Sequence, residues 1–209
     1  MDLFFAAAVA LALAWMFKTR AERARIARLA THLRQYDIEK LMETLSEGYL
    51  RAIGEEDAQR RQAIWTLLEP SERKICEQFG QFAQRFGQDS EADSRVMRPA
   101  WPASALLLWL APVFPRLLER HSFDMRRLLA LHAQALSQAA QATALPASEK
   151  AFTMLAELML MQHSCHWFCK SRQVASARLL LRHQTPYAKV LASVAPDTLK
   201  AYQALTGVA

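Results

Sequence analysis

The sequence predicts an all-α protein in which a single N-terminal transmembrane helix is followed by a multi-helix bundle domain. Three observations support this prediction. Residues 3–17 form an uncharged apolar run, apolar residues elsewhere recur at spacings of three and four, and no segment alternates with the period of two expected of a strand. The chain also holds only 5 glycines among 209 residues, which argues against a sheet-rich enzyme with many tight turns.

The first expected element is a transmembrane anchor over residues 1–17. As a helix these residues span roughly 25 Å, at the short end of what crosses a hydrocarbon core of ~30 Å. Trp15 lies where an interfacial aromatic is expected, and Lys18 and Arg20 can lengthen the span by reaching back to the lipid headgroups.

The residues after this anchor are strongly basic, because six basic side chains between residues 18 and 34 are opposed only by Glu22. The residues assigned to lipid contact or to topology are Trp15, Lys18, Arg20, Arg23, Arg25 and Arg28. The positive-inside rule places such a flank in the cytoplasm and the N-terminus outside. A secretory signal carries its positive charge before the apolar run. We therefore favour an uncleaved anchor over a cleaved signal, for which residues 10–14 offer small side chains, and over a buried helix of a soluble protein.

The anchor helix is expected to continue as a basic juxtamembrane helix over residues 18–36, and Asp37 then reads as the N-cap of the next helix. That helix carries an apolar stripe at helical spacing. The stripe consists of Ile38, Leu41, Met42, Leu45, Tyr49, Leu50 and Ile53. It can pack in the core of the domain, or it can contact a second copy of the chain or another membrane protein.

Two further helices complete a first helical subdomain over residues 37–87. One covers residues 55–68 and is expected to end at Pro70, and the next begins at Ser71 and ends at Gly87. Residues 88–100 are polar and are predicted to be a linker to a second helical subdomain, residues 101–209.

The second subdomain opens with an uncharged segment, Trp101 to Phe114, that is interrupted near its end by Pro112. It is short for a membrane span and has basic residues on both sides, whereas a span shows charge asymmetry. We favour a buried core helix for it, ahead of an interfacial or re-entrant segment and of a true span.

The rest of the subdomain reads as a series of helices. Ser122 is expected to cap one that runs to about Thr143, and a long central helix follows from Pro146 to about Lys170. A helix over residues 173–183 and two short helices after Pro186 and Pro196 complete a bundle of about seven or eight helices.

The central helix carries the candidate metal site, Cys165, His166 and Cys169, in the run HSCHWFC. Thiolate and imidazole are good zinc ligands, and on a helix these three side chains fall within roughly one 100° arc. One helix cannot supply a tetrahedral set, so packing of the cysteines in the core is the favoured alternative. Three cysteines imply no disulfide framework, which fits a reducing, cytoplasmic compartment.

A basic strip is the last candidate site. It consists of Lys170, Arg172, Arg178, Arg182 and Lys189. No acidic residue lies between Glu157 and Asp197, so the strip can face anionic lipid, an acidic protein or nucleic acid, or can simply be solvated. Because the anchor already holds the domain at the membrane, nucleic acid is the least expected partner.

The functional prediction is a non-enzymatic one, because the sequence has no Gly-rich phosphate loop, no nucleophile elbow and no zincin motif. No cofactor is implied. The net charge of +6 lies mostly in the flank at residues 18–34. We predict a bacterial inner-membrane protein that serves as a scaffold or accessory subunit of a larger complex, with the membrane and a protein partner or a second copy as its contacts. A metal- or redox-responsive regulator and an anionic-lipid or nucleic-acid binding domain are the alternatives.

Overall fold

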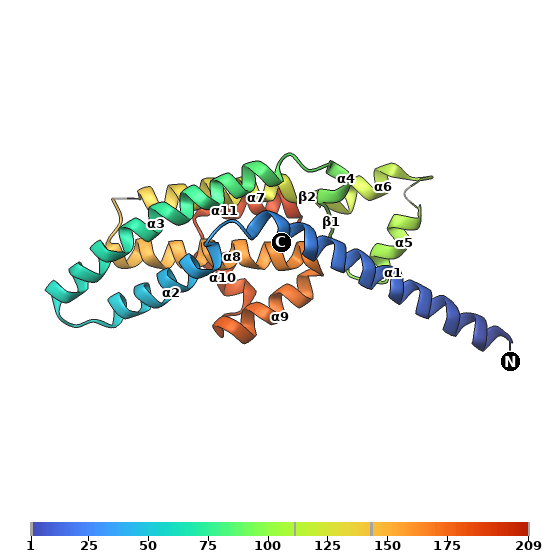
Figure 1. The fold of residues 1–209 in the computed structure, drawn as a ribbon, viewed down its shortest axis with the longest axis horizontal. Helices are drawn as coiled ribbons and strands as arrows, with labels where there is room; N and C mark the ends of the chain where they lie inside the picture. The colour runs from blue at the N-terminus through green and yellow to red at the C-terminus, as the bar shows by residue number, and fades with distance from the viewer. Residues whose placement is uncertain (1, 111, 143, 209) are drawn as a thin grey trace.

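The computed structural model describes residues 2–110, 112–142 and 144–208, and it confirms the all-α fold. Met1, where the predicted anchor begins, and Thr143, where one helix was expected to end, lie outside these residues. The described residues form eleven helices and one two-stranded sheet (Figure 1). The helices are α1 (Asp2–Leu33), α2 (Ile38–Gly54), α3 (Ala58–Phe86), α4 (Glu91–Ser94), α5 (Ala103–Leu110), α6 (Pro115–Arg120), α7 (Met125–Gln141), α8 (Ala147–Cys169), α9 (Arg172–His183), α10 (Tyr187–Ser193) and α11 (Pro196–Thr206). The strands are β1 (Arg95–Met97) and β2 (Ser122–Asp124).

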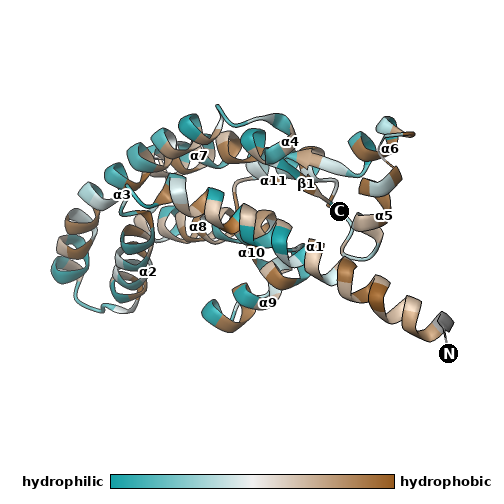
Figure 2. Ribbon diagram, turned by 45° about the vertical axis from the view of Figure 1, so that its right-hand side comes forward, coloured by the Kyte–Doolittle hydropathy of each residue, from teal (hydrophilic) through white to brown (hydrophobic). Residues whose placement is uncertain are grey.

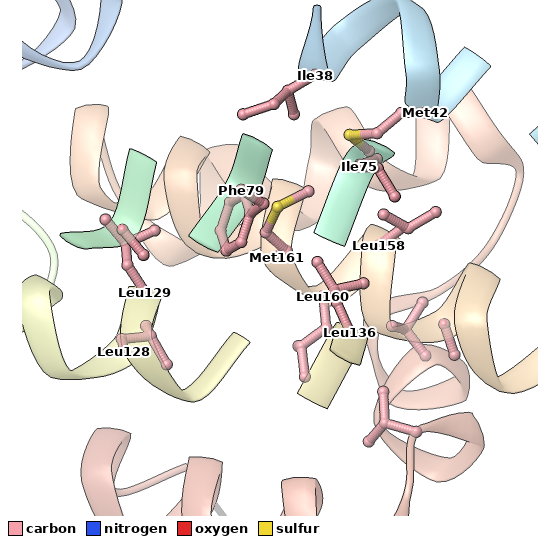
Figure 3. Packing of buried hydrophobic residues seen from close by; sticks show 14 of the residues in the cluster. Ile38, Met42, Ile75, Phe79, Leu128, Leu129, Leu136, Leu158, Leu160 and Met161 are labelled. Atoms are coloured by element: carbon pink, nitrogen blue, oxygen red, sulfur yellow. The ribbon is translucent and has the colours of Figure 1, made fainter. Parts of the chain in front are cut away.

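One hydrophobic core joins the bundle. The helices α2, α3, α7 and α8 contribute side chains to it, and Figure 3 shows Met42, Phe79, Leu136 and Met161 among them. α8 runs through the centre, as its nearly all-round apolar sequence predicts. The core takes residues from both sides of segment 88–100, so the two expected subdomains share it.

The apolar stripe of α2 packs into this core. Five of its residues are buried there, whereas Ile53 is half-buried and Leu50 is exposed. The buried residues are Ile38, Leu41, Met42, Leu45 and Tyr49. Because they contact α3 and α8 of the same chain, most of the stripe is not available to a protein partner.

The expected helix end at Pro70 is wrong, because α3 continues through it from Ala58 to Phe86. A proline inside a helix removes one backbone hydrogen bond and costs about 3 kcal/mol. Here Pro70 lies on the exposed side, while the buried Leu68 and Ile75 on either side of it pack into the core. Packing of both halves of α3 therefore offsets the cost of the proline.

Segment 88–100, predicted as a linker, is instead built into the fold. Ser90 caps α4 by accepting a hydrogen bond from the backbone N–H of Asp93, and β1 then pairs antiparallel with β2. Ser122 was expected to cap a helix but belongs to β2. The cap of α7 is Asp124, whose carboxylate accepts from the backbone N–H of Arg126 at 2.9 Å.

The expectation that residues 101–114 form a core helix is wrong. α5 contains no buried residue, and Trp109, Val113 and Phe114 are exposed in this region. The pairing of β1 with β2 explains this. The two strands flank α5 and α6 in the sequence, so their pairing leaves both helices in a loop that projects from the bundle (Figure 1). Arg98 links the two ends of this projecting segment to the bundle, because its guanidinium donates hydrogen bonds to the backbone carbonyls of Arg120 and Leu205.

The helix α1 has two different halves. It contains a stretch long and apolar enough to cross a membrane, and the side chains of residues 4–13 are exposed. Figure 2 shows this part as a brown segment that projects from the bundle. Its second half lies against α3 and α8, and Leu29 is buried in the core. A single unbroken helix therefore links the apolar segment to the domain.

Candidate membrane-facing site

A groove of about 740 Å³ lies where α1 meets the bundle. Its walls come from α1 between Ala14 and Arg25, from segment 97–101, from α5, and from the junction of α8 with α9. We call it the anchor groove. It starts beside the exposed apolar part of α1 and extends toward the domain, so it lies at the level where the apolar part of α1 gives way to its basic part.

The anchor groove is lined by apolar side chains and by several basic ones. The apolar lining side chains include Phe17, Met97, Trp101, Leu108, Trp167 and Val174. The basic lining side chains are Lys18, Arg25, Arg98 and Lys170, and the single acidic one is Glu22. Lys18 lies 3.7 Å from Glu22, and its ammonium group also lies 5.7 Å from the centre of the Trp101 ring.

The second half of α1 is fixed to the bundle by polar contacts as well as by packing. Arg28 forms a salt bridge with Asp93 at 2.9 Å and lies 3.8 Å from Asp89. Nε2 of His32 lies 3.2 Å from the carboxylate of Asp89, and the His32 ring packs against Phe86. These contacts hold α1 at a set angle to α3 and α4, and they give the groove a fixed wall.

Arg25 differs from the other basic residues of the juxtamembrane helix. It is partly buried, and burial lowers the pKa of its guanidinium, with the thiol of Cys169 and the carboxylate of Glu22 nearby. Within the part of the chain that the structure describes, no side-chain hydrogen bond or salt bridge joins Arg25 to another residue. Arg25 therefore places a charge at the groove that no carboxylate neutralises by direct contact.

Of the other residues assigned to lipid contact or topology, Lys18 lines the groove and Arg28 faces the bundle, whereas three lie on the outside of α1. Trp15, Arg20 and Arg23 are exposed, and the ammonium group of Lys18 lies 4.8 Å from the centre of the Trp15 ring. Trp15 and Lys18 thus sit together at one level of the helix, as an interfacial pair does.

The structure does not assemble the candidate metal site. Among the described residues, no group of three or more His, Cys, Asp or Glu side chains is placed to hold one ion. Burial raises the pKa of Cys165 to about 12 and that of Cys169 to about 11, and burial lowers the pKa of His166. Metals bind the thiolate, so neutral thiols in apolar surroundings favour the packing role.

The basic strip spans three elements, because Lys170 follows α8, the three arginines lie on α9 and Lys189 lies on α10. Arg178, Arg182 and Lys189 are exposed, and the guanidinium of Arg172 lies 5.8 Å from the centre of the Trp167 ring. Lys170 instead lines the anchor groove. Leu180 and Leu181 are exposed beside the arginines, so α9 presents apolar and basic side chains together on its surface.

Two buried histidines make polar contacts inside the bundle. Nε2 of His132 lies 2.8 Å from Oγ of Ser164, and Nε2 of His163 lies 3.1 Å from Oγ of Ser176. The His163 ring stacks on Tyr187 with a centroid distance of 4.1 Å. Burial lowers the pKa of each imidazole to about 3, so both rings are neutral near pH 7.

Sequence reasoning missed the anchor groove itself. Its lining residues come from four separate segments, and those within residues 101–114, such as Trp101 and Leu108, were expected in the core. The available signals were Lys18 and Arg25 within the basic flank, and the apolar segment at residues 101–114, which is short for a membrane span. Comparison of the chain with protein-family models, with curated proteins and with solved structures gives no match.

Proposed function

We propose that this chain is a single-pass protein of a bacterial inner membrane, with its N-terminus outside and its helical domain in the cytoplasm. In this role it is a non-catalytic scaffold or accessory subunit of a larger membrane-associated complex. The observation that carries the proposal is the continuity of α1, which is apolar and exposed over residues 4–13 and packed onto the bundle in its second half. Such a helix holds the domain at one orientation to the bilayer.

The position of α5 supports this orientation. α5 lies beside α1 at the level of Lys18, and Trp109, which is 76% exposed, projects from it together with Leu106 and Leu108. Exposed tryptophan and leucine side chains beside a membrane helix are typical of a segment that lies in the bilayer interface. In this arrangement α5 is a second contact with the lipid surface, next to the anchor.

The surface of α9 supports a protein contact. Leu180 and Leu181 are exposed between Arg178 and Arg182, and an exposed apolar patch with basic neighbours suits a partner surface that is apolar and acidic. Because α1 fixes the orientation of the domain, α9 is presented to neighbours in the plane of the membrane in the same way on every copy.

The proposal is tested by purifying a C-terminally tagged full-length chain in mild detergent and measuring the size and composition of the complex. We expect a protein partner at a fixed ratio, and we expect Leu181→Glu to release it, because the new charge opposes an acidic partner. Leu67→Glu is the matched control, because Leu67 on α3 is 75% exposed and Leu181 is 83% exposed. A chain that purifies as a lone monomer would contradict the scaffold role. A partner retained by both variants would contradict the assignment of the contact to α9.

A further inference from the structure

The scaffold role makes no use of the anchor groove. Its volume of about 740 Å³ falls within the ~300–1,000 Å³ of sites that bind small molecules. On α1 its lining begins at Ala14 and Phe17, inside the apolar segment, and reaches Arg25. A molecule can therefore enter the groove sideways from the hydrocarbon layer without passing through water.

The walls of the groove suit an apolar chain. Phe17 of α1 and Leu108 of α5 line its membrane end, and Trp101 lies between the two helices. Trp167, which is 1% exposed, and Val174 line it on the α8–α9 side. These side chains offer an acyl chain an apolar surface that continues the bilayer into the domain.

The groove also suits an anion, because its charged lining side chains are mostly basic. Of these, Lys18 lies next to Glu22, and Arg98 donates to backbone carbonyls. Arg25 and Lys170 are therefore the basic lining side chains that can bind a ligand. Guanidinium and ammonium groups bind phosphate oxygens with charge-assisted hydrogen bonds, and arginine can do so through two parallel bonds.

We propose that the anchor groove binds one anionic phospholipid from the cytoplasmic leaflet, with an acyl chain against Phe17, Trp101 and Leu108 and the phosphate at Arg25 and Lys170. This inference rests on the membrane position proposed above for α1. Anionic lipids are abundant in that leaflet, and basic groups at its surface attract them. The bound lipid fills the gap between α1, α5 and the bundle, and it links the anchor to the domain.

The test uses the full-length chain in lipid nanodiscs, with Trp167 as the only tryptophan after replacement of Trp15, Trp65, Trp101 and Trp109 by phenylalanine. Bromine atoms on lipid acyl chains quench tryptophan at short range, without direct contact. The probes are brominated phosphatidylglycerol, which is anionic, and brominated phosphatidylcholine, which has no net charge. Because Trp167 lies within the domain, lipid of the surrounding bilayer does not reach it, and quenching reports a chain inside the groove.

We expect Trp167 to be half-quenched at a lower mole fraction of phosphatidylglycerol than of phosphatidylcholine. Arg25→Gln is expected to reduce that preference about fivefold, the usual contribution of one basic group near anionic lipid. Arg23→Gln is the matched control, because it removes the same charge from the exposed side of α1, outside the groove lining, and is expected to reduce the preference less than Arg25→Gln does.

Four results would overturn the inference. No quenching of Trp167 in a chain that stays with the nanodisc would show that lipid does not enter the groove, while the anchor would stand. Equal quenching by both lipids, or equal effects of the two arginine variants, would show that the groove does not select an anionic headgroup. A chain that does not stay with the nanodisc would overturn the anchor and this inference together.

Discussion

Lowering the pH from 7 to 5 is expected to reduce the free energy of unfolding by about 4 kcal/mol through His132 and His163 together. Burial holds the pKa of each ring at about 3 in the folded state, against 6.5 for an ordinary histidine. Because the folded pKa lies below the unfolded one, the unfolded chain takes up protons first as the pH falls. The stabilisation is therefore complete above about pH 6.5 and is lost progressively toward pH 3.

The environment of His132 explains the low pKa. The hydroxyl of Ser164 donates to the carbonyl of Leu160 at 2.9 Å, so Nε2 of His132 carries its proton and donates to Ser164. Among the described residues, Nδ1 has no hydrogen-bond partner. A second proton at Nδ1 would place a charge inside the core with no acceptor, and His163 nearby opposes it further.

The measurement is urea unfolding of the purified chain in detergent at pH 7 and pH 5, followed by tryptophan fluorescence. His132→Gln and His163→Gln are each expected to remove about 2 kcal/mol of the difference between the two pH values. Burial raises the pKa of Glu157, which acts in the opposite direction, so the difference between variant and wild type is the quantity compared. Leu136→Ala is the control, because it destabilises the same core without removing a titrating group. A histidine variant that keeps the full pH dependence would contradict this expectation.

Replacing Lys150 by methionine is expected to destabilise the domain by about 2–4 kcal/mol. Its ammonium group donates to Glu72, whose other carboxylate oxygen accepts from the hydroxyl of Tyr49 at 2.6 Å. The side chains of Lys150 and Glu72 are only 21% and 9% exposed. Loss of Lys150 leaves a buried carboxylate with a single neutral partner. Burial, and then the bond to Glu72, raise the pKa of Tyr49, which keeps its hydroxyl protonated and able to donate.

A matched control is the exposed pair of Lys74 with Asp37 at 2.8 Å, in which the side chains are 51% and 56% exposed. Lys74→Met removes the same charge and is expected to cost less than about 1 kcal/mol, because water screens an exposed pair. In the Lys150→Met background, Glu72→Gln is expected to restore part of the lost stability by removing the buried charge. Equal losses for the two lysine variants would contradict the burial argument, and urea midpoints at pH 7 decide between the outcomes.

The parts of the fold that depend on local sequence could be predicted from it. The stripe from Ile38 to Tyr49 is buried as its helical spacing indicates, and Gly207 ends the last helix in the left-handed conformation that favours glycine. The exposed apolar part of α1 was visible in its composition alone. These features are determined by residues within one or two helical turns of each other.

Features that depend on distant contacts could not be predicted in this way. Pro70 was expected to end a helix, but the packing of both halves of α3 holds the helix together. Residues 101–114 are apolar enough for a core, and only the pairing of Arg95–Met97 with Ser122–Asp124, which are far apart in the sequence, places them outside. Periodicity reports which residues are apolar, but it does not distinguish a core from a lipid surface.

The candidate site shows the same division. The basic flank from Lys18 to Arg28 was visible as a local run of charge, but the difference between Arg25 and Arg23 depends on which side of α1 meets α8. Cys165, His166 and Cys169 share one helix. Among the described residues, however, the structure places no group of three or more potential ligands around one ion position. Sites assembled from several elements require the tertiary structure.

The central claim, that α1 crosses the membrane with the domain in the cytoplasm, is tested most directly by the topology of the C-terminus in intact cells. A reporter enzyme that is active only in the periplasm would be fused after residue 209, and a reporter active only in the cytoplasm would be fused there in parallel. We expect the periplasmic reporter to be silent and the cytoplasmic one to be active, with the fusion retained in the membrane fraction. Activity of the periplasmic reporter would contradict the orientation and would favour a cleaved signal in place of the anchor.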